Sequence, residues 1–452
     1  MTASTPQGRL VSRSSLFGSS ILVIENVLRL GLVAAVSLWI AHQLGPAQFG
    51  LLNYASAVVG VFWSAATLGL DTPLTARLAL SRKPGLALGS AVALRIFTGL
   101  IGAALALLAA LLLRGDDQEA VLLIAIVALA APLSAPFVID AWFKAHNDAL
   151  PPALARLVAT LLSCAAKIAC LALGGGVVAL AWTVALESLL VATALLVAYR
   201  VRAPRGAAAR LFVQRAEMVT LLRESWPFMF STLAVAAYMK LDVVMLGAIT
   251  TNEQTGLYSL SQKLAEVLYI VPVVVVDVLF PQLVRHQAIH GDAAAAPQVF
   301  FDLSFGVALL ATLLAISCVV VALPALFGEP YRPTVDIFIV HAWACLGVAL
   351  GHARFKWMAA TGRQALVPWV ALLGLVLAVL LHSLLIPAYG ATGAAAATVV
   401  AFLASGWLTS YLFPSLRPAA KMQTRALWPW GRLWREWRQW RVGAAAAKGV
   451  AQ

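Results

Sequence analysis

The sequence predicts an all-α polytopic membrane protein with about twelve transmembrane helices in two six-helix lobes. Of its 452 residues, 62% are Ala, Val, Ile, Leu, Met, Phe, Trp, Tyr or Cys, and only 11% are charged. Soluble domains are about half apolar and a quarter charged, so this chain has too few polar residues to cover a surface in water. Its apolar runs of about twenty residues are each long enough to cross a hydrocarbon core of about 30 Å. A soluble enzyme, a secreted module and a disordered scaffold are therefore excluded.

Apolar segments account for nearly the whole chain, and short connections with turn signals such as Gly45-Pro46 and Tyr389-Gly390 join them. The first segment follows Arg9 and Arg13. It is too long for the core of a signal peptide and has no cleavage site after it. The predicted spans are 17–43, 47–69, 86–113, 119–142, 150–173, 177–199, 225–248, 256–283, 299–327, 335–358, 364–386 and 391–413.

The placement of Lys and Arg predicts the orientation of these spans, because loops that face the cytoplasm are rich in both. With the N-terminus inside, 25 of the 32 Lys and Arg fall in inner segments, two fall in outer segments and five lie within spans. Arg156, Arg354 and Lys356 are among the charges assigned to inner segments. Adding or removing one span would destroy this alternation, so we predict a multi-pass protein with both termini in the cytoplasm.

An internal repeat divides the spans into two sets of six. The motif Gln48-Phe49-Gly50-Leu51 recurs as Gln254-Thr255-Gly256-Leu257, and the longest inner connection, with six Arg between 200 and 223, separates the halves. Because six is even, both halves enter the membrane in the same direction, as do the parallel repeats of transporters. The predicted parts are a cytoplasmic N-terminus (1–16), an N-lobe (17–203), a linker (204–218), a C-lobe (219–415) and a basic, Trp-rich cytoplasmic or interfacial tail (416–452).

The motifs of familiar enzymes are missing from the sequence. It has no phosphate-binding GxxxxGK[ST], no HExxH and no GxSxG, and its outer loops are only a few residues long. His286 and His290 have helical spacing but no third ligand beside them, and the four cysteines lie in apolar runs without a CxxC pair. The chain is predicted to move a substrate without converting it, so we expect no enzyme activity, no cofactor, no metal site and no nucleic-acid partner.

Ionisable residues within the spans are the candidate functional residues, because each costs about 2.5–3.5 kcal/mol on insertion scales. The cations could converge on one interior cavity, and Arg holds a phosphate through two parallel hydrogen bonds. The predicted substrate-binding residues, for a pyrophosphate or another anion, are Arg29, Arg95, Lys167, Lys240 and Lys263. The candidates for ion coupling or charge pairing are Glu25, Asn26, Asp242 and Glu266.

Helical spacing leaves structural alternatives open for two of these cations. Glu25 and Arg29 are four residues apart and Lys263 and Glu266 are three apart, so each couple could pair on one helix face. Arg95 has no acid at such a spacing on its own helix.

The same test leaves Lys167 without an acid on its helix, and it separates Lys240 from Asp242, which are two residues apart and face different ways. Arg95 and Lys167 are therefore the strongest candidates for the substrate path.

The tail is predicted to contain an interfacial helix. Trp430, Leu433, Trp434, Trp437 and Trp440 fall on one side of a helix, and Arg432, Arg435 and Glu436 fall outside it. A basic helix with a Trp face lies in the membrane interface and favours anionic lipid. A tail whose positive charge only fixes the topology is the alternative.

Short motifs along the chain carry a family resemblance. They are Leu44-Gly45-Pro46-Ala47-Gln48-Phe49-Gly50, Trp226-Pro227 followed by Lys240-Leu241-Asp242 and Met245-Leu246-Gly247, Thr255-Gly256-Leu257-Tyr258-Ser259, and Phe280-Pro281. Together they resemble bacterial polysaccharide-transporter flippases of the multidrug/oligosaccharidyl-lipid/polysaccharide exporter superfamily, over most of residues 15–415.

The resemblance implies two lobes forming a V and a specific kind of transport. Such flippases hand an undecaprenyl-pyrophosphate-linked oligosaccharide repeat unit from the cytoplasmic to the periplasmic leaflet of the bacterial inner membrane by alternating access, for O-antigen, capsule or exopolysaccharide synthesis. The implied partners are this glycan, the lipid bilayer and a polysaccharide polymerase or export machinery. The membrane potential, H⁺ or Na⁺ could supply the energy.

Two other functions stay open. A cation-coupled multidrug antiporter of the same architecture would depend on acids and not on bases. A membrane glycosyltransferase or polymerase would be expected to have a sizeable polar outer segment, which this sequence does not contain.

Overall fold

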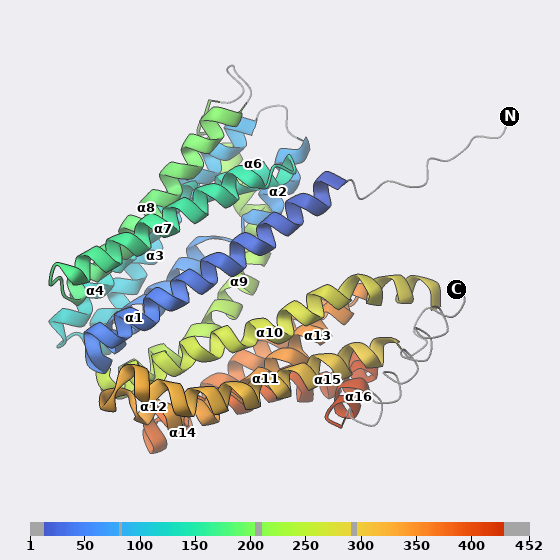
Figure 1. Cartoon of the computed structure of the whole chain (residues 1–452). Coiled ribbons are helices and arrows are strands. Elements are labelled where there is room, and N and C mark those ends of the chain that lie inside the picture. Colours follow the sequence, from blue (N-terminus) through green and yellow to red (C-terminus); the bar gives the residue numbers. More distant parts are fainter. Residues whose placement is uncertain (1–12, 81–83, 204–209, 291–295, 429–452) are drawn as a thin grey trace, which may run out of the picture. The chain divides into compact units, whose positions relative to one another are not determined.

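The computed structural model describes residues 13–80, 84–203, 210–290 and 296–428, and every regular element within these ranges is a helix (Figure 1). The chain forms two compact units. The first comprises residues up to Leu44 together with Tyr54–Ala236, and the second comprises Gly45–Asn53 together with the residues from Ala237 onward. This division falls within helix α9 (Arg215–Ile249), which therefore begins in the first unit and ends in the second.

The first unit is built around long apolar helices. Its elements are α1 (Arg13–Ala66) without its residues 45–53, α2 (Asp71–Leu80), α3 (Pro84–Arg114), α4 (Gln118–Ala128), α5 (Ala130–Leu133), α6 (Ile139–Ala145), α7 (Leu150–Ala172), α8 (Val177–Arg202) and the start of α9. Its core includes Leu74, Leu88, Phe143 and Tyr199.

The core of the second unit includes Phe301, Phe338 and Trp357. Its elements are the end of α9, α10 (Asn252–His290), α11 (Ala296–Phe327), α12 (Pro333–His341), α13 (Ala344–Ala360), α14 (Val367–Leu403), α15 (Thr409–Leu412) and α16 (Arg417–Ala426). A π-helical turn, Ala404–Leu408, joins α14 to α15.

The described residues account for the predicted spans. Nine of their helices are long and apolar enough to cross a membrane, and two of these are 52 and 49 residues long. At 1.5 Å per residue such helices measure about 75 Å, more than twice a hydrocarbon core of about 30 Å. Each breaks at a glycine with positive φ, Gly45 (74°) and Gly390 (55°), a conformation that glycine adopts without strain. Counting each of them as two spans, and the pair α12–α13 with its 42° bend as one, gives twelve.

The repeat predicted from the sequence reappears as matching breaks in the fourth span of each half. In the first half α4 ends at Ala128, and the span continues through α5 and a 3₁₀ turn to α6. Pro132 and Pro136 lie in this stretch, and a proline removes a backbone donor and interrupts a helix. In the second half the corresponding span is the bent pair α12–α13.

The two copies of the repeat motif also pack against each other. A Cβ added to Gly50 would overlap the carbonyl oxygen of Asn252 and the amide nitrogen of Gly256, and a Cβ added to Gly256 would overlap the carbonyl oxygen of Pro46. The second copy of the motif therefore needs glycine because two helix backbones approach closely there.

We expect Gly256→Ala to lower the free energy of unfolding by about 1–3 kcal/mol, the usual cost of overpacking, because backbone would have to move. Gly31→Ala is the matched control, since a Cβ there meets open space. The measurement is the midpoint of thermal unfolding of the detergent-solubilised protein. Equal midpoints for the two variants would contradict the close approach.

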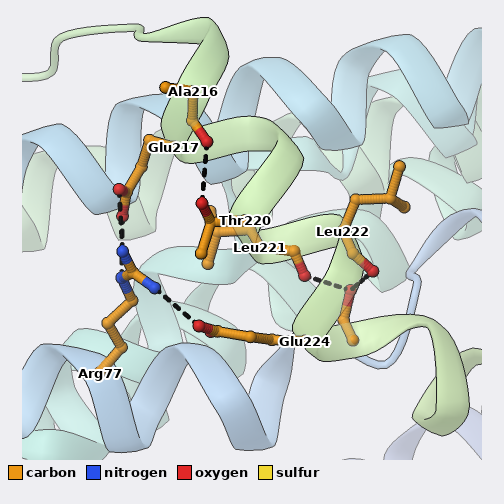
Figure 2. A network of polar contacts seen from close by, with 8 residues as sticks. Arg77, Ala216, Glu217, Thr220, Leu221, Leu222 and Glu224 are labelled. Carbon is orange, nitrogen blue, oxygen red and sulfur yellow. Dashed lines mark hydrogen bonds and ion pairs between the residues drawn. The ribbon is translucent and has the colours of Figure 1, made fainter.

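The first turns of α9 are fixed to the first unit by polar contacts (Figure 2). The Arg77 guanidinium on α2 binds both carboxylate oxygens of Glu217, with Nε–Oε1 and Nη2–Oε2 distances of 2.9 Å, and its Nη1 donates to Glu224 at 2.9 Å. Just before α9, the amide of Phe212 donates to the carbonyl of Gly85 at 3.2 Å. These contacts explain why the start of α9 belongs to the first unit.

Candidate functional site

A cavity of about 460 Å³ lies within the first unit. Charged side chains from six helices line it: Arg29 (α1), Asp71 (α2), Arg95 (α3), Asp140 (α6), Arg156 (α7) and Glu187 (α8). Trp63 and Thr160 also line it, and the indole N–H of Trp63 has no hydrogen-bond partner among the described residues. Ionisable groups at membrane depth face a water-filled cavity or each other, so this cavity is the first candidate for a substrate site.

Arg95 is the most exceptional of these side chains. It is only 6% exposed, and among the described residues its guanidinium has neither a hydrogen-bond nor an ion-pair partner. Asp71 is the acid whose charge acts on it through space. A buried cation is normally paired, since leaving it alone in a low-dielectric interior is costly. The cavity therefore holds an arginine that could accept an anion.

Lys167, by contrast, is already paired. Its Nζ donates to Oε2 of Glu187 at 2.7 Å, and the Ser163 hydroxyl donates to the same oxygen at 2.9 Å. The sequence reasoning looked for an acid only on the helix of Lys167, whereas Glu187 lies on α8, which packs along α7 (Figure 1). A role of Lys167 in binding substrate stays a prediction.

Arg156 was counted with the inner segments and lies near the start of the predicted span 150–173. It lies within α7 and lines the cavity, where its Nη1 donates to Oδ1 of Asp140 at 2.7 Å. The signal was present in the sequence, because Arg156, Thr160, Ser163 and Lys167 recur at the three- and four-residue spacing of one helix face. That face points inward, where its polar side chains contact acids and line a cavity.

The predicted residues of the first span are only partly described. Arg29 lines the cavity together with Arg95. The side chains of Glu25 and Asn26 lie outside the described residues, so the proposed Glu25–Arg29 pair and their coupling role stay predictions.

The remaining predicted cations lie together in the second unit. Lys240 on α9 lies 3.5 Å from Oε1 of Glu266, and Lys263 lies 3.4 Å from Oε2 of the same carboxylate. The Lys263–Glu266 pair, the structural alternative, is thus present, but a second cation shares the acid. All three side chains are about one-third exposed, at 35%, 28% and 32% for Lys240, Lys263 and Glu266. This cluster therefore has one more positive than negative charge.

Asp242 lies in a different environment from Lys240, as their spacing predicts. Its carboxylate is buried and accepts hydrogen bonds from the Tyr258 hydroxyl (2.7 Å), the Gln262 amide (3.2 Å) and the amide nitrogen of Val243 (2.8 Å). Within the described part of the chain, no Lys or Arg lies within ion-pair distance of it.

The network around Asp242 extends to a buried histidine that the sequence analysis did not single out. The Tyr258 hydroxyl also meets Thr398 Oγ1 at 3.0 Å, and that oxygen lies 3.3 Å from Nε2 of His382. Each side chain in this hydrogen-bonded series can donate or accept a proton. Asp242 and His382 are 140 residues apart in sequence, so no local pattern connects them.

Arg354 was likewise counted with the inner segments and lies near the end of the predicted span 335–358. It lies in α13, is 5% exposed, and its Nη1 donates to the hydroxyls of Thr409 (2.9 Å) and Ser410 (3.0 Å). The end of α13 therefore contacts α15 through these hydrogen bonds, and α13 also packs against α16.

In the described residues, no group of three or more His, Cys, Asp or Glu could hold a metal ion. The side chains of His286 and His290 lie outside the described residues. So does the tail from 429 onward, with its Trp face. The described start of the tail, α16, is held by Gln423, whose amide donates to the carbonyls of Leu350 (3.0 Å) and Gly406 (2.7 Å).

Comparisons with known proteins agree with this architecture. A family model described as polysaccharide biosynthesis protein matches residues 15–287. A solved structure of the lipid II flippase MurJ in an inward closed conformation is similar at a TM-score of 0.71 and 12% identity, over 90% of each chain. An inward-facing multidrug resistance MATE family transporter of the MOP superfamily is similar at 0.66 and 14%, over 90% of this chain and 98% of that one.

The eukaryotic MATE transporter AtDTX14 is also similar, at a TM-score of 0.54 and 15% identity, over 91% of this chain and 100% of that chain. A search of curated proteins finds no match. At these identities the structures show the fold alone, and they confirm the predicted all-α architecture.

Proposed function

The chain belongs to the polysaccharide biosynthesis protein family, and from this premise we propose that it is a flippase for an undecaprenyl-pyrophosphate-linked oligosaccharide. It would move this unit from the cytoplasmic to the periplasmic leaflet of a bacterial inner membrane, without changing it chemically. The glycan would then serve O-antigen, capsule or exopolysaccharide synthesis and pass to a polymerase or export machinery.

The observation that carries this proposal is the buried Arg95, which has no direct partner in the part of the chain that the structure describes, in a cavity that Arg29 also lines. A diphosphate offers several acceptor oxygens to an arginine and replaces the water that the arginine loses on burial. The cavity volume of about 460 Å³ lies in the usual range of small-molecule sites, about 300–1,000 Å³. It suits the diphosphate and the adjacent part of the glycan, while the polyprenyl chain stays in lipid.

The sugar next to the diphosphate would contact Trp63 and Thr160. The indole of Trp63 combines an apolar ring with an N–H that has no partner among the described residues. Such a side chain can pack on a sugar ring and donate to one of its hydroxyls.

Coupling to an ion would use the second unit. Asp242 is a buried carboxylate with three neutral donors, and H⁺ or Na⁺ would neutralise it. Binding of the ion would favour one conformation of alternating access, because an uncompensated buried charge is costly. The membrane potential would add about 2.3 kcal/mol per charge per 100 mV for an anion that leaves the negative side.

The same acid favours the alternative function, a cation-coupled multidrug antiporter. In that case toxic cations would compete with transport, and Arg95 would be dispensable. Transport of a lipid-linked anion therefore requires Arg95, whereas transport of a free cation does not.

A deletion strain tests the proposal. Polyprenyl-linked oligosaccharide would be located with a membrane-impermeant probe on intact spheroplasts. We expect complete, unpolymerised units to accumulate on the inner leaflet. Normal arrival of these units on the outer leaflet would exclude the flippase function and leave the antiporter.

A further inference from the structure

In the part of the chain that the structure describes, the Glu187 carboxylate has one oxygen with partners and one without. Its Oε2 accepts from Lys167 Nζ at 2.7 Å and from the Ser163 hydroxyl at 2.9 Å, whereas its Oε1 accepts from no group there. The side chain is 30% exposed and lines the cavity of the first unit. Two donors on one oxygen fix the orientation of the carboxylate, and the other oxygen is available to a ligand.

The other two acids that line the cavity are placed differently. Asp140 uses both oxygens, one for Arg156 at 2.7 Å and the other for a lysine of its own helix at 3.2 Å. Asp71 is the acid whose charge acts on Arg95, so it belongs to the part of the cavity that would hold the diphosphate. Glu187 is thus the acid that is both oriented by its partners and available to the rest of the ligand.

Two buried hydroxyls lie near Glu187 on the same pair of helices. Thr160 precedes Ser163 by three residues and therefore lies on the same face of α7, about one turn away, and Ser188 follows Glu187 on α8. Thr160 and Ser188 are 2% and 4% exposed, both line the cavity, and among the described residues neither hydroxyl has a hydrogen-bond partner. Val191 adds an apolar side chain to this wall. A carboxylate oxygen, two hydroxyls and apolar surface suit a neutral sugar, whose hydroxyls donate and accept hydrogen bonds.

We propose that Glu187 is a specificity-determining residue, which selects a lipid-linked glycan whose first sugar, the one attached to the diphosphate, is neutral and not acidic. The inference rests on the proposed function. A hydroxyl of this sugar donates to Oε1, and the hydroxyls of Thr160 and Ser188 bind its other oxygens. The carboxylate of an acidic sugar has no proton to donate, and it places a second negative charge beside Glu187 with both acceptors unpaired. Lys167 and Ser163 are positioning residues, because they orient the acid.

The test measures binding of three probes to the purified full-length chain by calorimetry: farnesyl diphosphate, farnesyl diphosphoglucose and farnesyl diphosphoglucuronate. The two sugar probes differ only at C6, where glucose has a hydroxymethyl group and glucuronate a carboxylate. The wild-type chain should bind the glucose probe at least about tenfold more tightly than the glucuronate probe, because like charges and unpaired acceptors disfavour the latter. Glu187→Gln should remove this preference and leave the affinity for farnesyl diphosphate, which has no sugar, unchanged.

A second variant separates the acceptor from its ion pair. Glu187→Gln leaves Lys167 without its acid, which by itself would attract glucuronate, so the double variant Lys167→Gln/Glu187→Gln is measured beside it. The double variant should bind the two sugar probes with affinities within about twofold of each other. Glu329→Gln, at an exposed acid outside the cavity, is the matched control and should keep the wild-type preference.

Binding of farnesyl diphosphate separates this inference from the proposed function. A wild-type chain that binds farnesyl diphosphate but binds the two sugar probes equally, or prefers the glucuronate probe, would overturn the role of Glu187 alone. A wild-type preference for glucose that survives in both Glu187 variants would overturn it as well. A wild-type chain that binds none of the three probes would overturn the proposed function.

Discussion

Arg95→Gln is expected to reduce flipping of the lipid-linked oligosaccharide by about tenfold to a hundredfold in kcat/KM. The variant removes the one buried cation of the cavity that lacks a direct partner in the described part of the chain, and charge-assisted hydrogen bonds contribute about 1.5–3 kcal/mol each. The measurement is initial flipping rate against substrate concentration in reconstituted vesicles.

The control is a change that removes charge in pairs. Arg332→Gln together with Glu329→Gln deletes an exposed ion pair of 3.4 Å outside the cavity and leaves the net charge unchanged. We expect this double variant to retain most of its activity. Equal losses in the two proteins would mean that transport responds to any loss of charged side chains, and the specific role of Arg95 would be withdrawn.

Asp242→Asn is expected to abolish the response of transport to an ion gradient. The amide has the shape of the carboxylate, and its oxygen can still accept from Tyr258, with its NH₂ group then on the side of the Val243 amide nitrogen. The amide cannot take up H⁺ or bind Na⁺ as a carboxylate does. Net accumulation driven by a gradient should fall to the level seen without a gradient.

Separate Na⁺ and H⁺ gradients across the vesicle membrane identify the ion. His382→Gln is the companion variant, because His382 joins the same network through Thr398. Loss of the response to a H⁺ gradient alone in this variant would indicate a proton path through the network. An Asp242→Asn protein that responds fully to both gradients would exclude coupling at this site.

The spans and their number could be predicted from the sequence because a helix that lies in lipid has apolar residues in every turn. The apolar runs are long, and the broken helices end at Gly45 and Gly390, two of the turn signals that the sequence contains. The glycine pair Gly50 and Gly256 was visible only as a repeated motif. That these two residues touch could not be read from either copy alone.

The site was harder to predict because its partners lie on other helices. Lys167 has no acid within helical reach, yet Glu187 neutralises it from α8. Arg156 and Arg354 lie near the ends of predicted spans and were counted only as inner charges, and the structure shows that one lines a cavity and the other is buried. Local spacing gives the charges on one helix, and only the packing of helices decides which of them are paired.

Flipping by the purified chain in vesicles tests the central claim most directly. Vesicles would carry a fluorescent polyprenyl-diphosphate oligosaccharide in both leaflets, and a membrane-impermeant quencher would report the outer fraction over time. The account predicts that the wild-type chain makes the whole pool accessible and that Arg95→Gln does so at least tenfold more slowly. The contradictory result would be that half of the labelled lipid stays protected from the quencher with the wild-type chain, in vesicles where the same protein transports a toxic cation.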